Sequence, residues 1–146
     1  MTFKKICFQN DKAQYITPSW DQLDSLTLSV AKKVKQSKIK FDLIIALAKG
    51  AWPMSRSFYD YTSIKELASL GVQFYSGINQ RLAKPNIYQK LPTTIKNKNI
   101  LIFDDVSDTG DSLIFTKEYL LKQGAKEVKT ATLFIKPWSK FIPDFY

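Results

Sequence analysis

The chain has 146 residues, of which 45% are hydrophobic and 14% aromatic, and its formal net charge is +9. A single domain of this length buries about 68–70% of the surface that its unfolded chain exposes, and such a composition excludes a disordered protein. The complete lack of histidine excludes Ser-His-Asp and Cys-His catalysis and most zinc sites, while the positive charge indicates an anionic partner, either a nucleic acid or a polyphosphate.

The N-terminal residues and the apolar runs predict a soluble cytoplasmic protein that does not bind a membrane. Cys7 is the only cysteine, and we expect it to be a small hydrophobic residue in the first strand, in a reducing compartment. Residues 1–5 lead into no apolar stretch of signal-peptide length. The longest apolar runs, such as residues 100–103, are too short to span a bilayer.

Two helices and a buried strand are predicted in the first part of the chain. Residues 19–22 form a capping box that begins a helix, and apolar residues recur at helical spacing from Leu23 to Val34. Residues 41–47 form a continuous apolar strand of the kind that is buried on both faces. A loop follows, and a second helix is predicted from near Ala51 toward Tyr61.

A long connection is predicted in the middle of the chain. Residues 72–75 have the composition of a strand, and residues 76–94 are a polar stretch that contains Pro85 and Pro92. A connection of this length without secondary structure is usually functional or mobile.

The last third of the chain alternates strand, helix and strand. Residues 99–103 are a second buried strand, residues 111–123 a helix that Gly124 ends as its C-terminal cap, and residues 127–135 a strand rich in β-forming residues. Alternating strands and helices predict an α/β domain with a parallel sheet covered on both faces. Ligands of such sheets bind at the carboxyl ends of the strands.

The strongest signal lies at one of these strand ends, in residues 104–112. Its hydroxyl residues Ser107, Thr109 and Ser112 can donate hydrogen bonds to a phosphate, and Gly110 allows backbone amides to approach closely. The helix that follows adds the partial positive charge of its N-terminus.

Two adjacent carboxylates, Asp104 and Asp105, precede this loop directly. They would repel a phosphate, but they suit sugar hydroxyls and the water shell of Mg²⁺. A simple turn with a capping residue would explain the Asp-Thr-Gly triplet, but not the carboxylate pair at the end of a strand.

This stretch resembles the phosphoribosyl pyrophosphate (PRPP) signature of type I phosphoribosyltransferases. The signature consists of a hydrophobic strand, two acidic residues, two variable residues, and then Asp-Thr-Gly followed by a hydroxyl residue. The resemblance implies that Asp104 and Asp105 bind the ribose hydroxyls of PRPP and Mg²⁺. It implies that Asp108 is the catalytic residue, placed near N7 of a base to accept or share a proton. The implied cradle for the 5-phosphate consists of Ser107, Asp108, Thr109, Gly110, Asp111 and Ser112. Asp111 is unexpected there, because it adds negative charge to a phosphate loop.

The loop at residues 48–51 is similar to the pyrophosphate loop of the same family. The resemblance implies that Lys49 and Gly50 bind pyrophosphate and that the Ala48–Lys49 peptide is cis. Ala51 departs from the family pattern, in which many members have a second glycine. An ordinary turn with an exposed lysine is the alternative.

The C-terminal segment, residues 136–146, resembles the base-binding hood of purine-specific members. The resemblance implies that Lys136 donates to O6 of a 6-oxopurine and that Trp138 stacks on the ring. The alternative places Lys136 on the surface and Trp138 in the core. Relatives usually continue with a further aromatic segment, so the pocket is open, is completed by a partner subunit, or belongs to a truncated chain.

The polar connection at residues 76–94 takes the place of the flexible lid in this family. Arg81, Lys84 and Lys90 would then meet pyrophosphate when the lid closes. A solvated basic loop with no such role is the alternative.

Taken as a whole, the resemblance implies a single phosphoribosyltransferase domain over residues 1–146. Its sheet would be flanked by helices, with a short hood. The implied enzyme is a Mg²⁺-dependent pentosyltransferase of purine salvage that joins PRPP to guanine, hypoxanthine or xanthine. A homo-oligomer, either dimer or tetramer, is also implied.

Three other functions remain open from the sequence. The first is a PRPP-binding regulatory module of the same fold that does not catalyse, and the second is a transferase for orotate or another pyrimidine. Lys136 and Pro137 argue against the pyrimidine enzyme. The third is a basic nucleic-acid-binding protein, which the presence of only two arginines disfavours.

Overall fold

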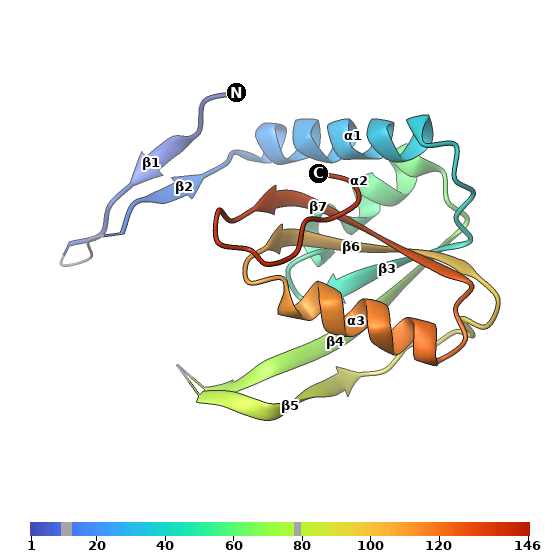
Figure 1. Cartoon of the computed structure of the whole chain (residues 1–146). Helices are drawn as coiled ribbons and strands as arrows, with labels where there is room; N and C mark the ends of the chain where they lie inside the picture. The colour runs from blue at the N-terminus through green and yellow to red at the C-terminus, as the bar shows by residue number, and fades with distance from the viewer. Residues whose placement is uncertain (10–12, 78–79) are drawn as a thin grey trace.

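A computed structural model describes residues 1–9, 13–77 and 80–146 of the chain. In this part of the chain, five strands form one sheet in the order β5-β4-β3-β6-β7 (Figure 1). β3 pairs in parallel with β4 and with β6, β6 pairs in parallel with β7, and β5 is antiparallel to β4. The strands are β3 (Leu43–Ala48), β4 (Glu66–Gly77), β5 (Gln80–Gln89), β6 (Asn99–Ser107) and β7 (Glu127–Ile135).

Helices cover both faces of this sheet, as the sequence predicts. The helices α1 (Trp20–Gln36) and α2 (Trp52–Thr62) lie on one face, and α3 (Asp111–Lys122) lies on the other (Figure 1). No helix among the described residues is long and apolar enough to cross a membrane. The architecture is the parallel, helix-flanked sheet expected from the alternating pattern.

The start of α1 is the predicted capping box. The backbone amide of Ser19 donates to Oε1 of Gln22 at 2.9 Å, and the amide of Gln22 donates to Oγ of Ser19 at 3.2 Å. These bonds satisfy two donors that the first helical turn would otherwise leave without partners. The helix buries Val30, Ala31 and Val34 against the sheet.

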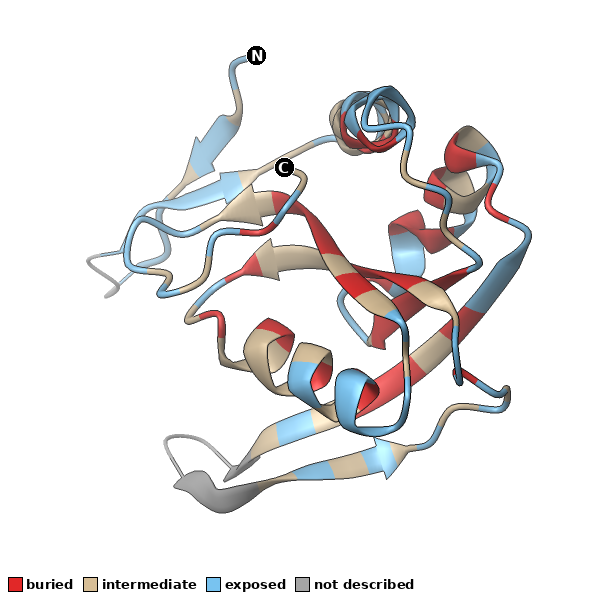
Figure 2. Ribbon diagram, turned by 45° about the vertical axis from the view of Figure 1, so that its right-hand side comes forward, coloured by how far each residue is buried: buried red, intermediate tan, exposed pale blue. Residues whose placement is uncertain are grey.

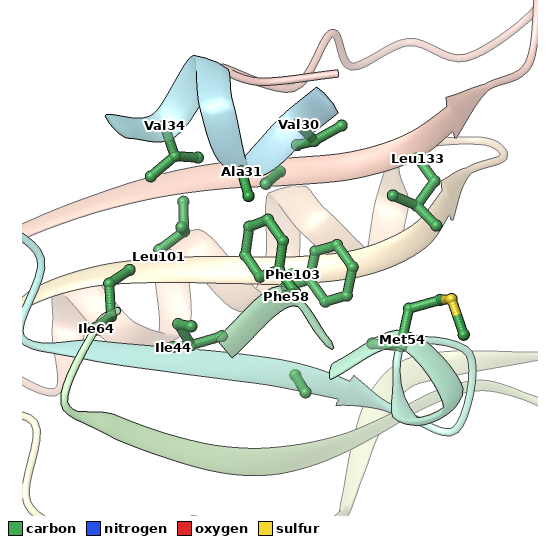
Figure 3. Packing of buried hydrophobic residues seen from close by; sticks show 13 residues of the cluster. Val30, Ala31, Val34, Ile44, Met54, Phe58, Ile64, Leu101, Phe103 and Leu133 are labelled. Atoms are coloured by element: carbon green, nitrogen blue, oxygen red, sulfur yellow. The ribbon is translucent and has the colours of Figure 1, made fainter. Parts of the chain in front are cut away.

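The core has two layers because successive residues of the central strands point to opposite faces. On the α1/α2 side the rings of Phe58 and Phe103 stack with centroids 4.1 Å apart (Figure 3). On the α3 side Ile45 and Ile102 pack with Leu113. Figure 2 shows buried residues concentrated in these strands and on the inner sides of the helices. Burial on both faces explains why β3 and β6 are continuously apolar.

The prediction of a structureless connection over residues 76–94 is wrong. β4 spans Glu66–Gly77, so it begins six residues before and ends two residues after the predicted strand 72–75, and β5 returns along it as an antiparallel edge strand. Pro85 belongs to this edge strand and falls where the register shifts, between the pairs Gln73↔Asn86 and Tyr75↔Arg81. Edges and bulges are the places where a sheet tolerates proline, so the proline is not evidence against a strand here.

The structure differs from the sequence prediction at two further places, at Cys7 and at the end of β6. Cys7 is exposed and follows β1 (Lys4–Ile6) rather than lying in it, because β1 pairs only with β2 (Tyr15–Thr17) in a two-stranded hairpin. This hairpin projects from the body and is largely exposed (Figures 1 and 2). β6 continues past residue 103 to Ser107, because β7 pairs with it as far as Ile135.

Candidate functional site

The candidate site lies where the neighbouring parallel strands β3 and β6 end. Each strand leads through a short turn into a helix, β3 into α2 and β6 into α3. The N-cap residues of the two helices, Ala51 and Gly110, make no side-chain capping hydrogen bond, and in α3 the first amide, that of Asp111, donates to the hydroxyl of Thr109. Two helix N-termini, each with backbone amides and partial positive charge, therefore lie at the carboxyl ends of the two central strands.

The two carboxylates at the end of β6 are partly buried and hold their own loop. The amide of Asp105 donates to Oδ1 of Asp104 at 3.0 Å, and the amide of Val106 donates to Oδ1 of Asp105 at 2.8 Å. Burial raises the pKa of Asp104 well above its ordinary value, and the adjacent charge of Asp105 raises it further. Hydrogen-bond donors or a cation at this position would relieve the cost of that buried charge.

The carboxylate pair fits a magnesium ion only in part. Among the described residues there is no group of three or more acidic, histidine or cysteine side chains that could hold a metal. Mg²⁺ prefers oxygen ligands, keeps several waters, and is often held by one or two carboxylates together with phosphate oxygens. Asp104 and Asp105 therefore suit an ion that arrives with a phosphorylated ligand.

The turn after β3 touches the acidic pair directly. A β-carbon placed on Gly50 would lie 2.4 Å from Oδ1 of Asp105, so a larger residue there would have to displace this carboxylate. The Ala48–Lys49 peptide is cis, as the resemblance to a pyrophosphate loop implied. The carbonyl of Ala48 accepts a hydrogen bond from the Tyr88 hydroxyl of β5 at 3.2 Å. The side chain of Lys49 is exposed.

The loop between β6 and α3 leads into the N-terminus of a helix, where backbone amides point toward the site. Gly110 occupies the N-cap position of α3 with φ +87°, a left-handed conformation that favours glycine. The hydroxyl of Thr109 accepts from the amide of Asp111 at 3.3 Å. Ser112 follows in the first turn of the helix. This arrangement is typical of a phosphate-binding helix N-terminus.

Ser107 differs from the expectation for a phosphate donor. Its side chain is buried. Its hydroxyl forms a 2.8 Å hydrogen bond with the hydroxyl of Ser139 and donates to the carbonyl of Phe141 at 3.1 Å. The reason is that β6 extends to Ser107, which turns this side chain into the protein. Ser107 therefore ties down the C-terminal segment instead of offering its hydroxyl to a ligand.

The C-terminal segment, residues 136–146, crosses over the glycine loop. The amide of Lys140 donates to the carbonyl of Thr109 at 3.1 Å, and a β-carbon on Gly110 would lie 2.5 Å from Cβ of Phe141. The end of the segment returns to β7, where Phe145 forms a parallel bridge with Ala131. The expected hood segment is thus anchored at both of its ends.

The three side chains expected around a base meet one another. Nε1 of Trp138 donates to Oδ1 of Asp108 at 2.9 Å, and Nζ of Lys136 lies 5.2 Å from the centroid of the Trp138 ring. Trp138 is 63% exposed, so the alternative that it is a core residue is wrong. Both of its partners are exposed as well.

One cavity borders the acidic pair and another borders the glycine loop. The first, about 530 Å³, lies toward α1 and α2; its lining is mostly apolar and includes Trp20, Gly50, Asp105, Lys136 and Pro137. The second, about 280 Å³, lies between β4 and the glycine loop; it is lined by Val72, Gln73, Phe74, Thr109, Asp111 and Ser112. The site can therefore receive an apolar ring on one side and a smaller polar group on the other.

Sequence reasoning missed several residues that shape this site. Tyr88 holds the carbonyl of the cis peptide, and Trp20 lines the larger of the two cavities; for Ser139 and Phe141, which fall inside the expected hood segment, the missed feature is their contact with Ser107. No local spacing marks them, because each meets the site through a contact distant in sequence. Lys90 is exposed after β5, while the side chains of Arg81 and Lys84 lie outside the described part of the chain.

This fold and this site define the type I phosphoribosyltransferase class. Residues 19–146 match the family model described as "Phosphoribosyl transferase domain", and the chain belongs to that family. The hypoxanthine-guanine phosphoribosyltransferase of Streptococcus thermophilus is 26% identical over 104 residues, which cover 70% of this chain and 58% of that protein. The enzyme of the same name from Lactococcus lactis is 28% identical over 115 residues, covering 76% and 62%. The chain thus spans roughly three-fifths of the length of these curated relatives.

Solved structures agree with this assignment. The crystal structure of a purine phosphoribosyltransferase from Pyrococcus horikoshii superposes with a TM-score of 0.75 at 35% identity, covering 87% of this chain and 82% of that one. A hypoxanthine-guanine phosphoribosyltransferase from Bacillus anthracis gives a TM-score of 0.76 at 19% identity, with 88% and 79% covered. The second likeness is one of fold alone.

Proposed function

We propose that this chain transfers ribose 5-phosphate from PRPP to a 6-oxopurine and releases pyrophosphate, as an enzyme of purine salvage. The observation that carries the proposal is the glycine loop between the acidic pair and the N-terminus of α3. Relatives named hypoxanthine-guanine and purine phosphoribosyltransferases support the purine class. Guanine, hypoxanthine and xanthine are the candidate bases.

Asp104 and Asp105 are proposed to bind the ribose. Sugar hydroxyls would donate to their carboxylates, which are otherwise bonded only to neighbouring amides in the contacts described. Gly50 packs against Asp105 and so sets the position of one carboxylate from the adjacent loop. Because burial and the charge of Asp105 raise the pKa of Asp104, hydrogen-bond donors or a cation from the ligand would stabilise its charged form.

The loop from Asp108 to Ser112 is proposed to cradle the 5-phosphate. Backbone amides at the N-terminus of α3 and the hydroxyls of Thr109 and Ser112 supply donors, and the helix supplies partial positive charge. Asp111 would take part through its backbone, since a carboxylate would repel the phosphate. Ser107 contributes by anchoring the C-terminal segment.

Lys49 and Gly50, at the start of α2, are proposed to bind the leaving pyrophosphate. The exposed ammonium group of Lys49 and the uncapped helix N-terminus both favour an anion there. Mg²⁺ bound beside Asp104 and Asp105 would neutralise charge on the pyrophosphate oxygens. The hairpin of β4 and β5 is proposed to act as the lid, since Tyr88 already reaches the pyrophosphate loop from it.

The base is proposed to bind between Lys136 and Asp108. Lys136 would donate to O6, and Asp108 would accept the N7 proton as the purine nitrogen forms its bond to the ribose C1. The bond from C1 to the pyrophosphate oxygen breaks in the same step. Much of the catalysis would come from positioning and from charges arranged before the reaction.

One assay tests the proposal. The protein is mixed with PRPP, Mg²⁺ and each of guanine, hypoxanthine, xanthine, adenine and orotate, and nucleotide formation is followed by absorbance and chromatography. We expect product with at least one 6-oxopurine and little with orotate. Heat of PRPP binding in calorimetry without product from any base would instead identify a regulatory binding module. Oligonucleotide binding that PRPP does not displace would favour a nucleic-acid partner.

Assembly and location are part of the same proposal. We expect a dimer or tetramer, which light scattering after size exclusion would measure, and a cytoplasmic location, which cell fractionation would measure.

A further inference from the structure

The indole of Trp138 contacts Asp108 and Lys136, the two polar side chains that are proposed to bind the base. Its N–H donates to Oδ1 of Asp108 at 2.9 Å, and the ammonium of Lys136 lies 5.2 Å from its ring centroid. Asp108 is the proposed acceptor of the N7 proton, and Lys136 the proposed donor to O6. An aromatic bicycle with an N–H donor therefore contacts both groups.

The chemical likeness between indole and purine is close. Each is a planar fused ring system of five and six members, and each can present an N–H of its five-membered ring to a carboxylate. An ammonium group within about 6 Å of an aromatic face is attracted to the ring, and indole is the strongest such partner among side chains. Trp138 thus satisfies the carboxylate as a purine N–H would, while it attracts the lysine through its ring face instead of through an O6 acceptor.

The backbone around Trp138 is fixed, but its side chain is not enclosed. The amide of Lys136 donates to the carbonyl of Ser107 at 3.0 Å, and the amide of Ser139 donates to the carbonyl of Lys136 at 3.0 Å. The Trp138 side chain is 63% exposed, and Asp108 is exposed too. The ring can therefore leave Asp108 by rotation about its own side-chain bonds, without unfolding of the segment.

We propose that Trp138 is a positioning residue that acts as an internal stand-in for the base: its indole holds Asp108 and Lys136 in place until a purine displaces it. This inference rests on the proposed function and goes beyond it, because it gives Trp138 a role opposed to that of a simple stacking platform. Binding of the base then competes with an intramolecular hydrogen bond. The apparent Kd for the base equals its intrinsic Kd divided by the fraction of molecules in which the indole has left Asp108.

The first test needs no activity. The chain has three tryptophans, so a ¹⁵N-labelled sample gives three indole N–H resonances, assigned with Trp138→Phe, Trp52→Phe and Trp20→Phe. We expect Asp108→Ala to move the Trp138 resonance upfield and to leave the other two unchanged. Asp111→Ala, which removes a charge from the same loop, is the matched control and should leave the Trp138 resonance in place. A Trp138 resonance that is unaffected by Asp108→Ala overturns the proposal.

The second test uses steady-state kinetics with hypoxanthine and PRPP. Trp138→Phe keeps an aromatic ring but removes the N–H, so we expect KM for hypoxanthine to fall about threefold to tenfold, the range that loss of one competing hydrogen bond allows. The change in KM for hypoxanthine should exceed any change in kcat or in KM for PRPP, because a bound purine has already displaced the indole from Asp108 before the chemical step. Trp52→Phe is the matched control, because the Trp52 indole donates to Ser69 and lies outside the proposed base contacts. An unchanged or increased KM for hypoxanthine in Trp138→Phe overturns the proposal.

The two tests separate this inference from the proposed function. A wild-type protein that makes nucleotide, with a Trp138 resonance insensitive to Asp108→Ala, would overturn the stand-in role and leave the enzyme assignment in place. A wild-type protein that makes no nucleotide would overturn the enzyme assignment. The resonance test would then decide alone whether Trp138 engages Asp108.

Discussion

The α-carbon of Gly50 packs against the carboxylate of Asp105, so closely that a β-carbon on Gly50 would lie 2.4 Å from Oδ1 of Asp105. This contact joins the turn after β3 to the acidic pair at the end of β6. The turn proposed for pyrophosphate and the carboxylates proposed for ribose therefore cannot be changed independently.

Gly50→Ala should displace Asp105 and weaken PRPP binding by at least about tenfold, because one ribose contact and the pyrophosphate turn move together. Isothermal calorimetry with PRPP and Mg²⁺ measures this loss. Gly124→Asn is the control: Gly124 also has a positive φ, which asparagine adopts more readily than most residues, but a β-carbon there would come no closer than 3.5 Å to Lys96, and Gly124 lies at the far end of α3. PRPP affinity equal to wild type in Gly50→Ala would mean that the contact does not position the site.

Asp108→Asn should lower turnover far more than it lowers PRPP binding. An asparagine keeps the size of the side chain but cannot take a proton from N7, and loss of such a group typically costs about 10²–10⁴-fold in rate. The kcat with hypoxanthine and the Kd for PRPP, measured on the same preparation, give the comparison. Equal losses in both would contradict the role of Asp108 as proton acceptor.

Asp104→Asn should stabilise the protein while it weakens the site. Burial and the charge of Asp105 raise the pKa of Asp104, so the folded state favours its protonated form and its ionisation costs stability. The stability contributed by wild-type Asp104 therefore falls as pH rises above its unfolded pKa. We expect the melting temperature of the variant, in chelator, to exceed that of wild type by about 2–4 °C at pH 7. The gap should narrow toward pH 4.

The same variant should bind PRPP and Mg²⁺ more weakly, since a neutral amide interacts less well with a cation and with hydroxyl donors. Thermal melts at several pH values and calorimetry provide the two measurements. A melting temperature below that of wild type at pH 7 would show that the Asp104 charge is not a cost to the fold.

Asp144 should make the opposite contribution to stability. Burial alone would raise the pKa of Asp144, but hydrogen bonds from the side chain and amide of Thr130, with the ammonium groups of Lys129 and Lys117, hold it below its ordinary value of 3.8. The carboxylate therefore stabilises the fold at neutral pH, and this contribution is lost as pH falls through the folded-state pKa. Asp144→Asn should lower the unfolding free energy by about 1 kcal/mol at pH 7.

Denaturant melts between pH 3 and pH 7 check this prediction. The difference between Asp144→Asn and wild type should shrink as pH falls through the folded-state pKa of Asp144, below which both side chains are neutral. Asp60→Asn is a suitable control, since Asp60 forms an exposed ion pair with Arg56 that contributes little. A difference that stays constant over the pH range would assign the effect to packing.

Much of the fold could be predicted because its signals are local. The apolar runs of β3 and β6 reflect burial on both faces, and the Ser19 capping box fixes the start of α1. β5 could not be predicted in this way. Its polar composition and Pro85 are typical of a loop, and only pairing with β4 makes it a strand.

The sequence by itself determined the acidic pair, the glycine loop and the helix after it, since these features lie within about a dozen consecutive residues whose chemistry requires no distant partner. Only the tertiary structure decided which other residues meet them. Trp138 bonds Asp108 from 30 positions away, and Tyr88 bonds Ala48 from 40 positions away. Such contacts follow from the order of strands in the sheet and from the return of the C-terminal segment over the loop, and neither leaves a spacing pattern in the sequence.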